Sequence, residues 1–136
     1  MTFAWGYNQL QKIAPDLDPV PRSLVHGDLI NRNVLVDDRR LTGVFDWGCS
    51  LYGDHLYDLA WFEFWAPWYP KLDIRALRAE LERRWRKMGY APANQDARLT
   101  ACYLRIGLDH LAYNATLGDW TALDATAARM RALVSR

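Results

Sequence analysis

The sequence predicts an α+β fold that is mostly helical, in which a small β structure is packed by about four helices. Two observations support this prediction. Short β-type runs gather between residues 23 and 46, whereas from residue 54 onward apolar residues recur at helical spacing between capping residues. Because a few short strands cannot cover their own apolar face, the helices must pack around them.

The length of the chain predicts a single domain over residues 1–136. Of the 136 residues, 51% are hydrophobic, which is enough for a sizeable core. No internal repeat, low-complexity segment or long linker divides the sequence. Within the domain we distinguish a lead-in helix with a proline-rich connector (1–22), a segment that carries the polar motifs (23–60) and a helical part (61–136).

The first predicted element is a weakly amphipathic helix over residues 3–13. Its apolar residues recur at spacings of three and four: Phe3, Tyr7, Leu10 and Ile13. Pro15, Pro19 and Pro21 then impose an extended connector. Residues 23–25 form a short predicted strand directly before the first polar motif.

Two further apolar runs predict a β-hairpin. Residues 34–36 and 41–46 are its paired strands, and the polar residues 37–40 form its turn. We expect residues 48–53, which begin and end with glycine, to form a loop.

Capping residues delimit the helices that follow. Asp54 is a candidate N-cap for a helix over 55–66, which Pro67 ends. Asp73 precedes a helix over 74–88, and Gly89 lies where a C′ glycine belongs. A long helix over 96–117 ends at Gly118-Asp119, which also cap a last helix over 120–134. The expected buried stripes are Ile74, Leu77, Leu81, Trp85 and Met88 on one helix, and Leu99, Tyr103, Ile106, His110, Tyr113 and Leu117 on the next.

Charge and cysteine content narrow the class of partner and the compartment. The net charge is +1 with both signs interspersed, which argues against a nucleic-acid partner held by bulk electrostatics. Cys49 and Cys102 stand far apart without metal-ligand spacing, so reduced thiols in a cytoplasmic protein fit best. The most apolar window, 56–69, contains Asp58, Glu63 and Pro67 and is too short and polar to span a membrane.

Three polar residues at the edges of the predicted hairpin suggest a phosphoryl-transfer site. Four residues separate Asp28 from Asn33, and Asp46 ends the second strand of the hairpin. Phosphoryl transfer needs a carboxylate near the attacking hydroxyl and oxygen ligands for Mg²⁺, and this set contains both.

Each of these residues also has an ordinary structural interpretation. Asp28 alone could cap a turn, Asn33 could be a loop amide and Asp46 could end a strand. His26 could be a core histidine bonded to a backbone carbonyl, and Gly27 any turn glycine. Their joint spacing, with Asp28 and Asn33 around one tight loop and Asp46 on the adjacent strand, favours the site.

At these positions the sequence resembles the aminoglycoside phosphotransferase family of the protein-kinase-like superfamily, with a hygromycin-phosphotransferase-like character. The family signature is His-Gly-Asp, four residues and Asn, then an apolar strand ending in Asp-Trp, and then Gly-Asp-Pro, two residues and Asp-Leu-Ala. The chain carries His26-Gly27-Asp28 with Asn33, then Asp46-Trp47, and then a block from Gly53 to Ala60. His55 replaces the usual proline of that block.

The resemblance implies a role for each matching residue. Asp28 is the catalytic aspartate that orients the acceptor hydroxyl and takes its proton. Asn33 and Asp46 are the magnesium ligands and so contribute to binding of the nucleotide cofactor. His26, Asp58 and Trp47 support the site structurally, with Asp58 holding the catalytic loop and Trp47 packing behind the metal site.

The resemblance further implies the catalytic carboxy-terminal lobe of a kinase-like phosphotransferase. It would use Mg²⁺ and ATP (or GTP) to phosphorylate a hydroxyl of an aminoglycoside or another small molecule, an activity associated with antibiotic resistance. Only 25 residues precede His26, without a glycine-rich loop or a strand lysine. We therefore expect the nucleotide-clamping lobe to be absent, the chain to be inactive alone, and its exposed face to self-associate. The alternative is a non-catalytic remnant that binds only a small ligand or a partner.

Overall fold

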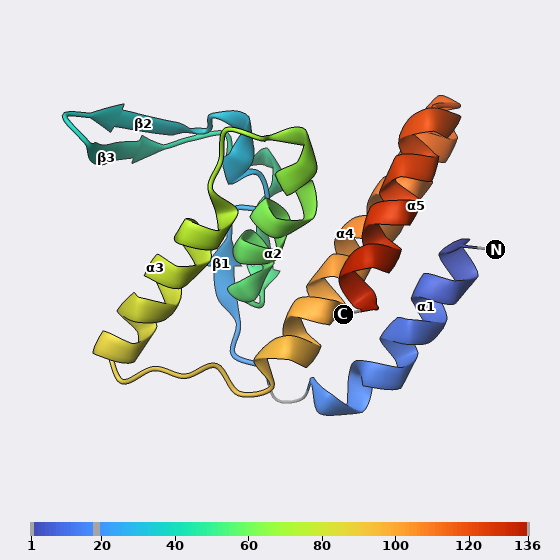
Figure 1. The fold of residues 1–136 in the computed structure, drawn as a ribbon, viewed down its shortest axis with the longest axis horizontal. Helices are drawn as coiled ribbons and strands as arrows, with labels where there is room; N and C mark the ends of the chain where they lie inside the picture. The colour runs from blue at the N-terminus through green and yellow to red at the C-terminus, as the bar shows by residue number, and fades with distance from the viewer. Residues whose placement is uncertain (1, 18–19, 136) are drawn as a thin grey trace.

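The computed structural model describes residues 2–17 and 20–135 and has a mostly helical α+β fold, as the sequence predicts. Figure 1 shows a β-hairpin projecting on one side of the molecule and three helices, α1, α4 and α5, gathered on the other. Helix α2 lies between these two parts. None of the described helices is both long and apolar enough to cross a membrane.

Helix α4 (Gln95–Leu117) is the element against which the other core helices pack. Helices α1 (Thr2–Ile13), α2 (Leu56–Trp65) and α5 (Trp120–Val134) each pack against it. Asp119 caps α5 as predicted, because its Oδ1 accepts a hydrogen bond of 2.9 Å from the Ala122 N–H. The largest fully buried side chains of the helical core are Leu56, Phe64, Leu104, Ile106, Thr126 and Met130.

The apolar residues that recur at helical spacing on α1 and α4 are buried only in part. On α1, Phe3 and Tyr7 are half exposed, and the helix turns Gly6 toward the core. On α4, the stripe leaves the core in the last turns, where Tyr113 and Leu117 are more than 60% exposed. The helices are where the periodicity places them, but which face is buried depends on the neighbouring helices.

Helix α3 (Ile74–Lys87) is peripheral. Asp73 caps it through a 2.9 Å hydrogen bond from the Ala76 N–H to Oδ1, and Gly89 follows it in the left-handed conformation, both as predicted. Its predicted stripe is only partly buried, because Trp85 lies in the core whereas Leu77 and Met88 are exposed.

The β structure consists of two separate antiparallel pairs. Strand β1 (Ser23–Val25) pairs with β4 (Leu51–Gly53), so the prediction of a loop throughout residues 48–53 is wrong. Strands β2 (Val34–Asp37) and β3 (Arg40–Val44) form the predicted hairpin, although β3 ends before Asp46. The β1–β4 pair was missed because the sequence 51–53 is short and its partner lies far away in the chain.

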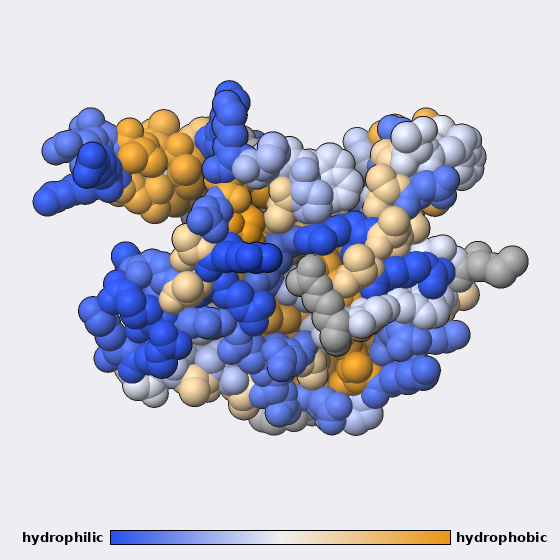
Figure 2. All heavy atoms as spheres, in the orientation of Figure 1, coloured by the Kyte–Doolittle hydropathy of each residue, from blue (hydrophilic) through white to orange (hydrophobic). Residues whose placement is uncertain are grey.

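The hairpin presents apolar side chains to solvent. Asp38 and Arg39 form its tight turn, both with positive φ. Leu35, Val36 and Leu41 are each more than half exposed. Figure 2 shows apolar surface on the hairpin next to a hydrophilic tip. Contiguous exposed apolar surface promotes association, but self-association of this chain through the hairpin stays a prediction.

The crossing of α4 and α5 gives a stability prediction at Gly107. A Cβ atom built on Gly107 would collide with Sδ of Met130 and would lie 2.7 Å from its Cγ. We expect Gly107→Ala to lower the free energy of unfolding by about 1–2 kcal/mol, because overpacking outweighs the gain of about 1 kcal/mol in helix propensity.

Urea denaturation of Gly107→Ala and Gly6→Ala would test this prediction. The Cβ of Gly6→Ala meets only the ends of two flexible side chains, Leu108 and Met130, at 3.0 and 3.1 Å. That variant should therefore be neutral or slightly stabilising. Equal effects of the two substitutions would contradict the prediction.

Candidate active site

The loop between β1 and β2 brings Asp28 and Asn33 together. Gly27 has a φ of 78°, a short 3₁₀ turn spans Leu29–Asn31, and Arg32 has a φ of 65°. These turns allow the Nδ2 of Asn33 to donate to the Asp28 carbonyl at 2.8 Å and to its Oδ2 at 3.2 Å. Asn33 is buried, so this amide fixes the orientation of the Asp28 carboxylate.

Asp58, in the first turn of α2, anchors the same loop. Its Oδ2 accepts a hydrogen bond from the His26 N–H at 3.1 Å, and its Oδ1 accepts one from the Gly27 N–H at 2.8 Å. A carboxylate that accepts two backbone hydrogen bonds is a strong anchor, because bonds to a charged group are stronger than neutral ones. The two residues before Asp28 are therefore held to the helical core.

His26 connects this loop to the segment that carries Asp46. Its Nε2 donates to the Phe45 carbonyl at 2.8 Å, and its Nδ1 accepts from the Asp28 N–H at 3.2 Å, which together select the Nε2–H tautomer. The Phe45 N–H donates to the Asn33 carbonyl at 3.1 Å. Phe45, the residue before Asp46, is thus bonded to both ends of the loop.

Asp46 follows β3 in the left-handed conformation, with φ 57° and ψ 60°, and is exposed. Trp47 packs on the His26 ring, with ring centroids 4.7 Å apart, and its Nε1 donates to the Val44 carbonyl at 3.2 Å. Trp47 remains 45% exposed, so it contacts His26 rather than filling a buried space.

The oxygen atoms at this site provide some of the ligands that a hard cation needs. Asn33 Oδ1 accepts no hydrogen bond from the described residues, and Asp46 offers a carboxylate. Such oxygen ligands suit Mg²⁺, which usually takes one or two from the protein and the rest from phosphates and water. Within residues 2–17 and 20–135 there is no cluster of three or more His, Cys, Asp or Glu that could hold a metal ion.

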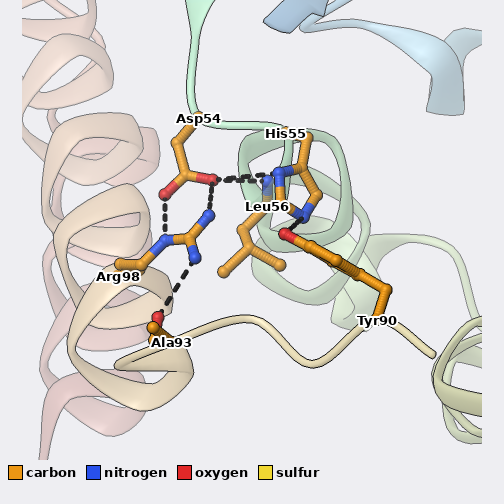
Figure 3. A network of polar contacts seen from close by, with 6 residues as sticks. All are labelled: Asp54, His55, Leu56, Tyr90, Ala93 and Arg98. Atoms are coloured by element: carbon orange, nitrogen blue, oxygen red, sulfur yellow. Dashed lines mark hydrogen bonds and ion pairs between the residues drawn. The ribbon is translucent and has the colours of Figure 1, made fainter. Parts of the chain in front are cut away.

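A second polar network lies behind the loop and was not predicted (Figure 3). Arg98 of α4 donates from Nη2 to Asp54 Oδ1 at 2.7 Å and from Nε to Asp54 Oδ2 at 2.8 Å. His55 Nε2 and the Tyr90 hydroxyl lie 3.2 Å apart. One signal in the sequence could have marked Arg98 as needing a partner, although not which one, since Arg98 shares a helix face with buried Cys102 and Ile106.

The network shifts the pKa values of three of its members, and the hydrogen bond to Asp54 raises that of Arg98. Burial would raise the pKa of Asp54, but the hydrogen bonds from Arg98 and the Leu56 N–H outweigh it and hold the pKa below its ordinary value. Burial lowers the pKa of His55, and Arg98 lowers it further, against the opposing charge of Asp54.

The depressed pKa of His55 predicts a loss of stability in mild acid. The unfolded chain binds a proton with the ordinary pKa of 6.5, and the folded chain binds it only at lower pH. The stabilisation is therefore complete above that value and is lost as the pH falls through the folded pKa. We expect His55→Gln to reduce the decline in melting temperature between about pH 7.5 and 5.5. Thermal denaturation of both proteins at several pH values would check this, and identical declines would contradict it.

Other polar and aromatic side chains of the helical part have structural contacts. Glu63 is buried, accepting from Arg78 Nη1 at 2.9 Å and from the Tyr103 hydroxyl. Asp109 pairs with Arg105 on the exposed face of α4. Trp65 packs edge-on against His110, with centroids 4.7 Å apart, and against Trp68 at 5.2 Å.

The chain is similar to known phosphotransferases. Residues 4–101 match the phosphotransferase enzyme family, APH. The chain is 40% identical over 93 residues to hygromycin-B 4-O-kinase of Escherichia coli, a match that covers 68% of this chain and 25% of the relative.

The chain is also similar to solved structures of aminoglycoside phosphotransferases. The chain superposes on the crystal structure of aminoglycoside phosphotransferase APH(4)-Ia with a TM-score of 0.76 at 33% identity, over 98% of this chain and 43% of that one. A thermostable mutant of APH(4)-Ia, in a ternary complex with AMP-PNP and hygromycin B, gives a TM-score of 0.76 at 34% identity and the same coverage. The chain thus spans less than half the length of these relatives, and it belongs to the phosphotransferase enzyme family, APH.

Proposed function

We propose that this chain is the catalytic lobe of a nucleotide-dependent phosphotransferase that acts on a hydroxyl group of a small molecule. The observation that carries the proposal is the bonded pair of Asp28 and Asn33, whose loop Asp58 holds to the helical core. This arrangement presents one oriented carboxylate beside an amide oxygen suited to a metal, and phosphoryl transfer depends mainly on such positioning.

In this proposal Asp28 is the catalytic residue. Its carboxylate accepts a hydrogen bond from the acceptor hydroxyl, orients it for in-line attack and takes its proton as the bond to phosphorus forms. His26, Asp58 and Trp47 are supporting residues, because their contacts reach the loop and not the reacting atoms.

Asn33 and Asp46 would hold Mg²⁺ together with the phosphates of ATP or GTP. The metal, when bound, neutralises charge that develops on the transferred phosphoryl group. The residues that grip the remaining phosphates and the base would come from outside this chain. In that case residues 1–136 alone do not turn over.

The relatives suggest the class of acceptor. One relative is a hygromycin-B 4-O-kinase, and a thermostable mutant of aminoglycoside phosphotransferase APH(4)-Ia was crystallised with hygromycin B and AMP-PNP bound. We propose an aminoglycoside-like hydroxyl acceptor and a cytoplasmic location, where the nucleotide is available. Such an activity would confer antibiotic resistance.

A chimera would test this function directly. Residues 1–136 would replace the matching part of APH(4)-Ia, and phosphorylation of hygromycin B by ATP and Mg²⁺ would be measured. Transfer of phosphate supports the proposal. A folded chimera that binds nucleotide and hygromycin B without transfer would instead favour the non-catalytic binding module.

The metal site gives a separate prediction. With only two protein ligands, the isolated chain should bind Mg²⁺ weakly, with a dissociation constant on the order of millimolar. Calorimetry should show that Asp46→Asn removes this binding, because a charged ligand is lost. The matched control is Asp38→Asn, the same change in the hairpin turn, which should leave binding unchanged. Tight Mg²⁺ binding that survives Asp46→Asn would refute the placement.

A further inference from the structure

We propose that Arg98 is a positioning residue for the loop of Asp28, acting through Asp54 on the two elements that hold that loop. That the loop of Asp28 takes part in catalysis rests on the proposed function. The positioning itself is a property of the folded chain, and it can be tested without turnover.

Arg98 is built into the protein interior. It is 3% exposed, although it is a charged residue near the start of α4. Figure 3 shows its guanidinium hydrogen-bonded to both carboxylate oxygens of Asp54. Its Nη1 donates to the Ala93 carbonyl at 3.1 Å. These three hydrogen bonds fix the guanidinium and make Asp54 its only carboxylate partner among the described residues.

Asp54 lies at the junction of β4 and α2. It directly follows Gly53, the last residue of β4. Its Oδ1 also accepts from the Leu56 N–H at 2.9 Å, and its carbonyl accepts from the Tyr57 N–H at 3.0 Å. The side chain and backbone of Asp54 therefore form the start of α2, and Arg98 ties this start to α4.

Both elements that meet at Asp54 hold the loop of Asp28. Strand β4 pairs with β1, with Val25 opposite Leu51, and Val25 immediately precedes His26. Helix α2 carries Asp58, one turn after Asp54, and Asp58 accepts the N–H groups of His26 and Gly27. The loop is thus held from its strand side and from its helix side, and the two supports share one anchor.

Removal of the Arg98 guanidinium would leave the Asp54 carboxylate partly buried without its countercharge. An uncompensated buried charge is strongly unfavourable, so the segment around Asp54 should move toward water. Such a movement separates β4 from the start of α2 and strains the bonds from Asp58 to the loop. The first measurable consequence is more frequent opening of the His26 and Gly27 amides.

Amide hydrogen exchange measured by NMR on the 136-residue chain tests this proposal. The variant is Arg98→Met, which keeps the apolar stem. The control is Arg105→Met, the same change on the same helix at an exposed arginine paired with exposed Asp109. The Ala127 and Met130 amides of α5 report general loss of stability.

We expect Arg98→Met to accelerate exchange of the His26 and Gly27 amides about tenfold more than that of the α5 amides. Arg105→Met should change neither set. Arg98→Lys keeps the charge but cannot form the bidentate hydrogen bond to Asp54. It should therefore accelerate exchange of the His26 and Gly27 amides by an intermediate factor. If Arg98→Met does not fold, Arg98→Lys decides by the same comparison.

Two results would overturn the proposal. In the first, exchange of the His26 and Gly27 amides accelerates only by the same factor as exchange of the α5 amides. Arg98 would then have a general structural role. The other is no change at these amides in a folded variant. Neither result depends on the phosphotransferase activity, so failure of this inference and failure of the proposed function can be told apart.

Discussion

In the active chimera, Asp28→Asn should lower kcat by roughly 10²–10⁴-fold, the range expected for loss of a general base. Asparagine has the size of aspartate but cannot take the proton of the acceptor hydroxyl. The fold should persist, because the side-chain oxygen of the introduced asparagine can still accept the hydrogen bond that Asn33 Nδ2 now gives to Asp28 Oδ2. Nucleotide affinity should also persist, because Asp28 is not assigned to the metal.

Steady-state kinetics with hygromycin B would give kcat and KM separately, and calorimetry would give the affinity for AMP-PNP. Asp38→Asn in the same chimera is the matched control and should retain full activity, because the hairpin turn tolerates asparagine with positive φ. Near-normal kcat in Asp28→Asn would remove Asp28 from its role. An equal loss in both variants would indicate a general effect on folding rather than an effect on the chemistry.

The geometry around Asp28 could be anticipated from sequence because it is local. Four residues between Asp28 and Asn33 permit one short turn, and a residue pair across such a turn is brought together by the backbone itself. The helix boundaries at Asp73, Gly89 and Asp119 were predictable for the same reason, since caps satisfy backbone groups only a few residues away.

The parts that were missed depend on contacts between distant segments. The β1–β4 pair joins residues whose short runs carry no alternating pattern, so only the folded chain reveals it. The partner of Asp54 is Arg98 on another helix, and no local rule selects one arginine among many. The exposed faces of Tyr7 and Leu77 show the same limit, because periodicity defines a stripe but tertiary packing decides how much of it is buried.

Gly27→Ala should be among the most destabilising single substitutions in the loop. Gly27 has a φ of 78°, where a side chain is strained, and a Cβ there would lie 2.7 Å from the Cys49 carbonyl oxygen. The backbone at residue 27 cannot move away easily, because Asp58 accepts a hydrogen bond from its N–H. The Cys49 carbonyl oxygen is also a backbone atom and cannot rotate away like a side chain. We expect a loss of about 2–4 kcal/mol in the free energy of unfolding, from backbone strain and the clash together.

Gly118→Ala separates these two contributions. Gly118 has a φ of 69°, close to that of Gly27, but nothing lies within 4 Å of its added Cβ. Its substitution should therefore cost only the backbone strain, about 1 kcal/mol. Urea denaturation of the two variants and the wild-type chain would give the loss in unfolding free energy for each substitution. The difference between the two losses measures the clash with the Cys49 carbonyl. Equal losses in the two variants would mean that the loop relaxes away from Cys49, and then the segment after Asp46 would not be held rigidly against the loop of Asp28.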